Sequence, residues 1–161
     1  MAVITFKGLD KYERQLSRLS KNAEKIAGAA IYEGAGIIAD EIRKSIESLP
    51  IVSGYGTPSK PLPGGVTKSQ KQGLLDGLGI SQMVNTSGYL NVKIGFDGYN
   101  STKTKSYPRG QPNQLVARGV ESGTSWKQKT PFIRPAIRRA SERSEKAMSK
   151  ELDKEFEKIM D

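Results

Sequence analysis

A single amphipathic stripe constrains the fold of this 161-residue chain more than any other feature. Between Ala23 and Leu49, apolar side chains recur every three or four residues, which places them on one face of a helix. The stripe comprises Ile26, Ala27, Ala30, Ile31, Ile38, Ile42, Ile46 and Leu49. Pro50 follows directly, and proline cannot continue a helix. We therefore predict one long central helix, with residues 1–161 forming a single domain around it.

Three glycines, Gly28, Gly34 and Gly36, lie inside this predicted helix. Each costs about 1 kcal/mol relative to alanine in a helix interior. Two interpretations follow from the sequence. The helix is locally weak there, or the backbone of another element comes close to it.

Helices are also predicted at both ends of the chain. Val3–Phe6 is typical of a short strand, and the capping-box spacing of Asp10 and Glu13 predicts a short separate helix after it. At the other end we predict a helix from Arg134 to about Met160, with Pro135 in its first turn. Its apolar face would consist of Ile137, Ala140, Ala147, Met148, Leu152, Phe156 and Ile159.

Strands are predicted in the middle of the chain. Leu90, Val92, Ile94 and Phe96 alternate with other residues, so they indicate a strand with one buried face that pairs with the preceding segment "GISQMV" as a hairpin. We expect a helical turn at Thr67–Asp76 and a last strand at Leu115–Glu121. The predicted fold class is α+β, with a small, mainly antiparallel sheet packed against the long central helix and the C-terminal helix.

Two long basic loops are expected to project from this body, over residues 50–73 and 97–113. A hydrophobic fraction of 35%, with 17 glycines and 8 prolines, favours loops that stay flexible until they meet a partner. The net charge of +9 favours acidic surfaces, nucleic acid or anionic lipid as partners. The loop cations that could contact DNA or assembly partners are Lys60, Lys68, Lys71, Lys103, Lys105 and Arg109. The alternative interpretation is that these lysines and arginines only keep solvated loops soluble.

Catalysis has little support in the sequence. The chain has no cysteine and no histidine, which excludes thiolate chemistry and disulfides and removes the commonest general base and transition-metal ligand. The segment "GVESG" resembles a nucleophile elbow, but its serine is one position late and no histidine could activate it. We expect no enzyme, no cofactor, no metal site and no small-molecule substrate. No apolar run approaches the length of a membrane span, so we also expect a soluble, unsecreted protein without membrane contact.

The segment after Gly123 contains the best candidates for a partner interface. Cations at a helix N-terminus oppose the helix dipole, and no acidic residue lies between Glu121 and Glu142 to offset them locally. The four cations are Arg134, Arg138, Arg139 and Arg143. One interpretation is that these arginines bind an acidic partner, a neighbouring subunit or DNA. The other is that they pair with acids of the same helix, such as Glu142 and Glu145. Trp126 and Phe132 are either core residues or interface anchors.

The same segment resembles a known family. "ARGVESGTSWKQKTPFIRPAIRRA" is similar to the motif A-R-x-x-E-x-G-T, a short loop and P-F-[LI]-R-P-A of the phage tail-completion and head–tail joining proteins typified by gene ten of phage Hong Kong 97. The matching positions are Ala117, Arg118, Glu121, Gly123, Thr124, Pro131, Phe132, Arg134, Pro135 and Ala136. The opening "ITFKGLDKYERQLSRL" also resembles the start of that family.

The resemblance implies a structural protein of the virion neck of a tailed phage or prophage, assembled in the bacterial cytoplasm. Such a subunit would form a ring with copies of itself. It would contact connector or stopper proteins and tail-tube or tail-terminator proteins, and would touch phage DNA without reading its sequence. Two alternatives stay open: a different minor tail or tail-terminator protein, and a small basic nucleic-acid-binding protein.

Overall fold

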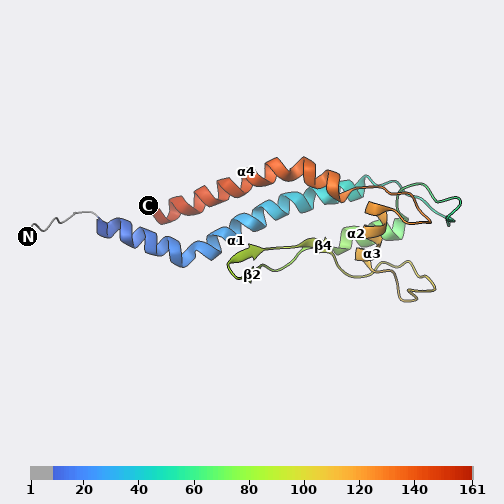
Figure 1. Cartoon of the computed structure of the whole chain (residues 1–161), viewed down its shortest axis with the longest axis horizontal. Helices are drawn as coiled ribbons and strands as arrows, with labels where there is room; N and C mark the ends of the chain where they lie inside the picture. The colour runs from blue at the N-terminus through green and yellow to red at the C-terminus, as the bar shows by residue number, and fades with distance from the viewer. Residues whose placement is uncertain (1–8, 161) are drawn as a thin grey trace, which may run out of the picture.

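The computed structural model describes residues 9–160, and the predicted strand Val3–Phe6 lies outside this range. Two long helices, α1 (Leu9–Glu47) and α4 (Ile133–Met160), run antiparallel and pack side by side as an elongated stalk (Figure 1). The separate helix predicted after Asp10 is wrong, because α1 is continuous through it. The residues between the two predicted helices do not break a helix, and Asn22 donates its side-chain N–H to the carbonyl of Arg18 within it.

The predicted apolar stripe is buried or partly buried on α1, and α1 packs against α4. Ile26, Ala30, Ile42 and Ile46 are buried on α1, while α4 buries Ala136, Ala140 and Ser144. Small side chains on α4 allow the two helices to approach closely. The long helix predicted to end before Pro50 is confirmed, since α1 ends at Glu47.

The three helix glycines differ in their surroundings. The Ser144 hydroxyl donates to the Gly34 carbonyl at 3.0 Å, and a Cβ at Gly34 would lie 2.6 Å from the Met148 Cγ atom. A Cβ at Gly28 would collide with the Met83 side chain. Two of the glycines therefore mark close approaches, by side chains rather than by another backbone. A Cβ at Gly36 would meet no described atom within 4 Å, so this glycine only weakens the helix.

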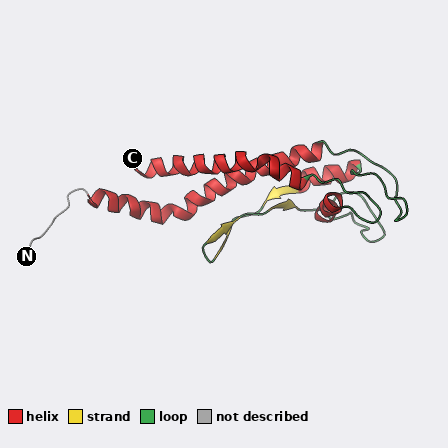
Figure 2. Ribbon diagram, turned by 45° about the horizontal axis from the view of Figure 1, so that its top comes forward, coloured by secondary structure: helices red, strands yellow, loops and turns green. Residues whose placement is uncertain are grey.

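The sheet is smaller than predicted but has the expected antiparallel pairing (Figure 2). β1 (Leu78–Ile80) pairs with β4 (Ile94–Phe96), and β2 (Val84–Thr86) pairs with β3 (Tyr89–Asn91). Together they form the predicted hairpin, divided into two two-stranded sheets that pack on α1. The predicted period of two is present, since residues 90, 92, 94 and 96 are partly buried and those between them are exposed. The α+β class is thus confirmed.

Two helices lie between this hairpin and the stalk: α2 follows the end of α1, and α3 precedes the start of α4, at the same end of the stalk. α2 (Lys68–Gly77) begins with a capping box between Thr67 and Gln70, so the predicted helical turn is a full helix and the predicted loop 50–73 is shortened at its end. α3 (Asn113–Ser122) occupies the place of the predicted last strand, which is wrong. Its buried residues, Asn113, Val116, Ala117 and Val120, have helical spacing. A short apolar run does not by itself distinguish a strand from a helix.

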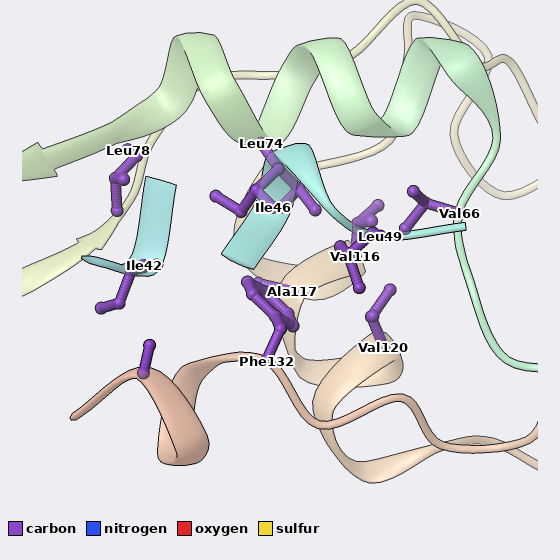
Figure 3. Close-up of a cluster of buried hydrophobic side chains, with 11 residues drawn as sticks. Ile42, Ile46, Leu49, Val66, Leu74, Leu78, Val116, Ala117, Val120 and Phe132 are labelled. Atoms are coloured by element: carbon purple, nitrogen blue, oxygen red, sulfur yellow. The ribbon is translucent and has the colours of Figure 1, made fainter. Parts of the chain in front are cut away.

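The hydrophobic core lies where the end of α1, the helices α2 and α3 and the start of α4 converge (Figure 3). Its members are Ile42, Ile46, Leu49, Val66, Leu74, Leu78, Val116, Ala117, Val120, Phe132 and Ala136. The ring of Phe96 on β4 contacts Phe132, with centroids 6.1 Å apart. The core therefore holds one end of the stalk to the loops, while the other end consists only of α1 and α4.

Glu121 joins α3 to α4 through the first turn of α4. Its carboxylate accepts the backbone N–H of Phe132 at 2.7 Å, of Ile133 at 2.8 Å and of Arg134 at 3.1 Å. These N–H groups have no partner inside the helix, and a carboxylate at this end also interacts favourably with the helix dipole. A residue twelve positions before the helix thus supplies the negative charge that the first turns of α4 lack.

Replacing Glu121 with glutamine should lower the free energy of unfolding by about 1–2 kcal/mol, since a neutral amide accepts weaker hydrogen bonds from the helix N-terminus. Urea denaturation followed by circular dichroism measures this. The control Glu145→Gln removes an exposed carboxylate from α4, the helix that Glu121 caps. It should change the free energy of unfolding by less than about 0.5 kcal/mol. Equal losses in both variants would contradict the capping role.

Candidate functional site

The charge of the chain is concentrated at the end of the molecule that carries the loops. Residues 50–139 contain 13 of the 26 lysines and arginines but only 3 of the 17 acidic residues. The remaining residues, most of which form the stalk, contain the other 13 basic residues and 14 acidic residues. The net charge of +9 therefore belongs to the loop end, and the stalk is nearly neutral. The loop end attracts anionic partners at longer range than any other part of the molecule.

A groove of about 870 Å³ opens at this end. Its lining residues come from the two long loops, from α3 and from the segment around Trp126. The apolar residues lining it are Val52, Tyr55, Leu62, Leu115, Val116, Val120 and Trp126, and its cations are Lys103, Arg118 and Lys127. No aspartate or glutamate is among its lining residues. We call this feature the loop groove.

Backbone hydrogen bonds hold the walls of the loop groove in place. The Leu62 N–H donates to the Trp126 carbonyl at 2.9 Å, and the Gln128 N–H returns a bond to the Leu62 carbonyl at 2.9 Å. Across the other loop, the Asn100 N–H donates to the Gln111 carbonyl at 2.9 Å. Gly56 lies so close to the Trp126 carbonyl that a Cβ there would collide with it. Both loops thus have specific partners here, and their flexibility before assembly stays a prediction.

The cations of the loop groove differ in their freedom. The Lys127 amine donates to the Gly65 carbonyl at 3.0 Å, and burial lowers the pKa of this lysine from its ordinary value of 10.5. Lys103 and Arg118 are exposed, and their side chains form no hydrogen bond or ion pair with any residue in the range 9–160. These two side chains are therefore available to bind carboxylates or phosphates. The sequence pattern does not single out Arg118 as a site residue, because its place beside the groove depends on α3 being a helix.

The other predicted loop cations do not form one site. Lys103 lines the groove, and Lys60, Lys68, Lys105 and Arg109 are exposed outside its lining. Lys71 has a different role: its amine donates to the carbonyls of Glu47 at 2.5 Å and Leu49 at 3.1 Å, at the C-terminal end of α1. A cation at that position interacts favourably with the helix dipole, so Lys71 stabilises the fold.

The two aromatic candidates are separated by burial. Phe132 is only 2% exposed and belongs to the core, so it is not an exposed interface anchor in this structure. Trp126 is 55% exposed and lines the loop groove, as does Tyr55, which is fully exposed at 100%. Large exposed aromatics beside a groove are typical of residues that contribute strongly to binding. The interface interpretation therefore rests on Trp126.

Two of the four arginines bind α1. Arg139 Nε donates to one carboxylate oxygen of Glu41 at 2.8 Å and Arg143 Nη2 to the other at 2.8 Å, while Arg139 Nη2 reaches the Ser45 hydroxyl at 2.6 Å. The alternative in which they pair with acids of their own helix is therefore wrong for these two arginines, and Glu142 binds Lys146 instead. The sequence gives no signal for Glu41, which lies 98 residues from Arg139.

The other two arginines are open to solvent. Arg134 lies 3.9 Å from Glu121, and its side chain is largely exposed. Arg138 is exposed, and its side chain makes no hydrogen bond or ion pair within the described part of the chain. The expectation of an external partner for the whole arginine run therefore narrows to Arg134 and Arg138, because an intramolecular acid already binds Arg139 and Arg143.

The described residues contain no group of three acidic side chains that could hold a metal ion. Ser122, the serine of "GVESG", is exposed at the end of α3 and lines the loop groove. Among residues 9–160, no helix is long and apolar enough to cross a membrane.

Comparisons with protein-family models, with curated proteins and with solved structures found no match for this chain. The case for a function therefore rests on the motif in the sequence and on the surfaces just described.

The ion pairs of Glu41 with Arg139 and Arg143 predict a specific dependence of stability on pH. The hydrogen bonds from Arg139 and Arg143 hold the pKa of Glu41 below its ordinary value of 4.5. A lowered pKa contributes stability above the ordinary value, and this contribution is lost as pH falls through the lowered value. Wild type should therefore melt at a higher temperature than Glu41→Gln from pH 7 to about pH 5, and the difference should shrink below about pH 4.5.

The measurement is thermal unfolding by circular dichroism over this pH range. Glu33→Gln is the matched control, because Glu33 is an exposed carboxylate on the same helix with no partner in the described range. Its melting temperature should stay parallel to that of wild type at every pH. A constant difference between wild type and Glu41→Gln down to about pH 3 would contradict the role of the ion pair.

Proposed function

We propose that this chain is a structural subunit of the neck of a tailed phage or prophage, acting in tail completion or head–tail joining. The observation that carries the proposal is the motif that resembles the one of that family, because its residues act together as one joint in this structure. Glu121 caps α4, Gly123 has a positive φ of 76°, and Phe132 and Ala136 enter the core.

The surfaces of the molecule also suit a role in assembly. The loop groove presents Trp126, Tyr55 and Arg118, and these residue types are common among those that dominate binding at protein interfaces. The expected partners are copies of this chain, a connector or stopper protein, and a tail-tube or tail-terminator protein. A different minor tail or tail-terminator protein is the alternative within the same class.

The test of this function is complementation in the phage that encodes the chain. Deletion of the gene should give separate heads and tails in electron micrographs, and a wild-type copy should restore joined particles. Trp126→Ala should reduce joining by about tenfold or more, since it removes the largest exposed anchor of the loop groove. Tyr89→Ala is the matched control, because Tyr89 is an exposed aromatic in the hairpin outside the groove.

Both variants must give circular dichroism spectra like that of wild type. Intact, infectious particles from the deletion strain would contradict the proposed function. Equal joining by the Trp126 and Tyr89 variants would leave the groove without a role in it.

Binding of nucleic acid is the second candidate, favoured by the concentration of positive charge at the loop end. Aromatic side chains beside lysines are typical of proteins that bind single strands by stacking and charge. Tyr55, Tyr99 and Trp126 are exposed among these cations. As a contact that accompanies assembly, such binding would be independent of sequence.

We therefore expect weak binding to a labelled oligodeoxynucleotide of about 30 nucleotides, measured by fluorescence anisotropy. The affinity should not depend on base sequence, and it should fall by about tenfold or more between about 50 and 200 mM salt, since counterions are released on binding. Lys103→Glu with Arg118→Glu should weaken it more than Lys21→Glu with Lys150→Glu on the stalk. Tight, sequence-dependent binding at physiological salt would instead favour a nucleic-acid-binding function.

A further inference from the structure

The end of the stalk opposite the loops carries an acidic and apolar face on α4. Asp153, Phe156, Glu157 and Met160 are all exposed, and their spacing of three and four residues places them on one side of the helix. We call this set the stalk-end face. The two lysines of the same turns are occupied elsewhere, because Lys154 pairs with Glu151 and Lys158 with Glu155.

The carboxylates of the stalk-end face have no partner inside the described part of the molecule. Neither Asp153 nor Glu157 makes a hydrogen bond or an ion pair with residues 9–160. Further exposed apolar side chains, Tyr12 and Leu16, lie on α1 at the same end. The two helices are tied together there by Gln15, whose side-chain N–H donates to the Met160 carbonyl at 2.6 Å.

The loop groove has the opposite chemistry to the stalk-end face. It combines apolar side chains with Lys103 and Arg118, whose side chains are unpaired within the described range, and no acidic residue lines it. An amphipathic helix that presents apolar side chains at this spacing is a common ligand for such a groove. Carboxylates at intervening positions of the same helix would meet the two cations.

The two surfaces cannot meet within one molecule. α4 begins beside the core at the loop end and continues for 28 residues, so its last turn lies about 40 Å from its first. The helix is continuous over this length and packs on α1 (Figure 1). The complementary partner of each surface therefore has to come from another copy.

We propose that the stalk-end face of one copy docks into the loop groove of a second copy. The contact uses two different surfaces, so it leaves one of each unoccupied and adds further copies until a ring closes or a filament grows. It deepens the proposed neck function, on which its biological role rests, by naming the surfaces through which the subunits associate. A second copy fits the groove better than nucleic acid does, because the stalk-end face supplies both apolar side chains and carboxylates, which match the apolar residues and the two free cations of the groove.

The experiment is sedimentation velocity of the full chain between about 1 and 200 µM at low salt. Wild type should form larger species as its concentration rises, and about 0.5 M salt should weaken the association. Asp153→Lys with Glu157→Lys alters only the stalk-end face, and Lys103→Glu with Arg118→Glu alters only the groove. Each of these variants alone should be monomeric, with the association constant reduced by about tenfold or more.

Mixing the two variants gives the decisive result. Each retains one intact surface, and the two reversed surfaces are also opposite in charge, so the mixture should associate although neither variant does so alone. Glu33→Lys with Asp40→Lys, which reverses two exposed carboxylates elsewhere on the stalk, should associate like wild type. Circular dichroism spectra confirm that every variant is folded.

Several outcomes would overturn the proposal. A wild type that stays monomeric at the highest concentration, or a mixture of variants that forms no complex, would do so. A monomeric wild type whose oligonucleotide binding is lost in the groove variant would assign the groove to nucleic acid. The neck function fails separately, if deletion of the gene leaves heads and tails joined.

Discussion

The packing of α4 on α1 is the interaction on which the rest of the structure depends. Ala136, Ala140 and Ser144 are small enough for α4 to lie close to the α1 stripe, and the Ser144 hydroxyl reaches the Gly34 carbonyl. This contact forms the stalk, because neither helix could bury its apolar face alone. It also separates the two ends of the molecule, since one end of the stalk carries the core and the loops, and the other end consists of the two helices alone.

The positive charges at the start of α4 are offset by acidic residues far away in the sequence. Glu121 on α3 caps the first turn, and Glu41 on α1 binds both Arg139 and Arg143. Glu121 and Glu41 thus hold the start of α4 to α3 and α1, and Arg138 stays exposed. The segment around Trp126, which precedes α4, is hydrogen-bonded to one long loop and lines the groove. Fold stability and the candidate interface therefore share one structural element.

The two ends of the molecule differ in charge. A basic, aromatic groove lies at one end, and a helix face with exposed carboxylates lies at the other. Different surfaces at opposite ends favour contacts that repeat from copy to copy, whereas a single self-complementary patch would stop at a dimer. This polarity is compatible with a subunit of an assembly and gives the proposed neck function a physical basis.

The sequence by itself determined the elements with long or regular patterns: the α1 stripe, the C-terminal helix, the alternating strand of the hairpin and the α+β class. It did not determine α3, because the short apolar run at 115–121 suits a strand as well as a helix, and only burial of Asn113, Val116 and Val120 on one side selects the helix. The tertiary structure alone decided the partners of Arg139 and Arg143, the exposure of Trp126 and the groove. Each of these depends on residues tens of positions apart meeting in space, and periodicity within a segment carries no information about such meetings.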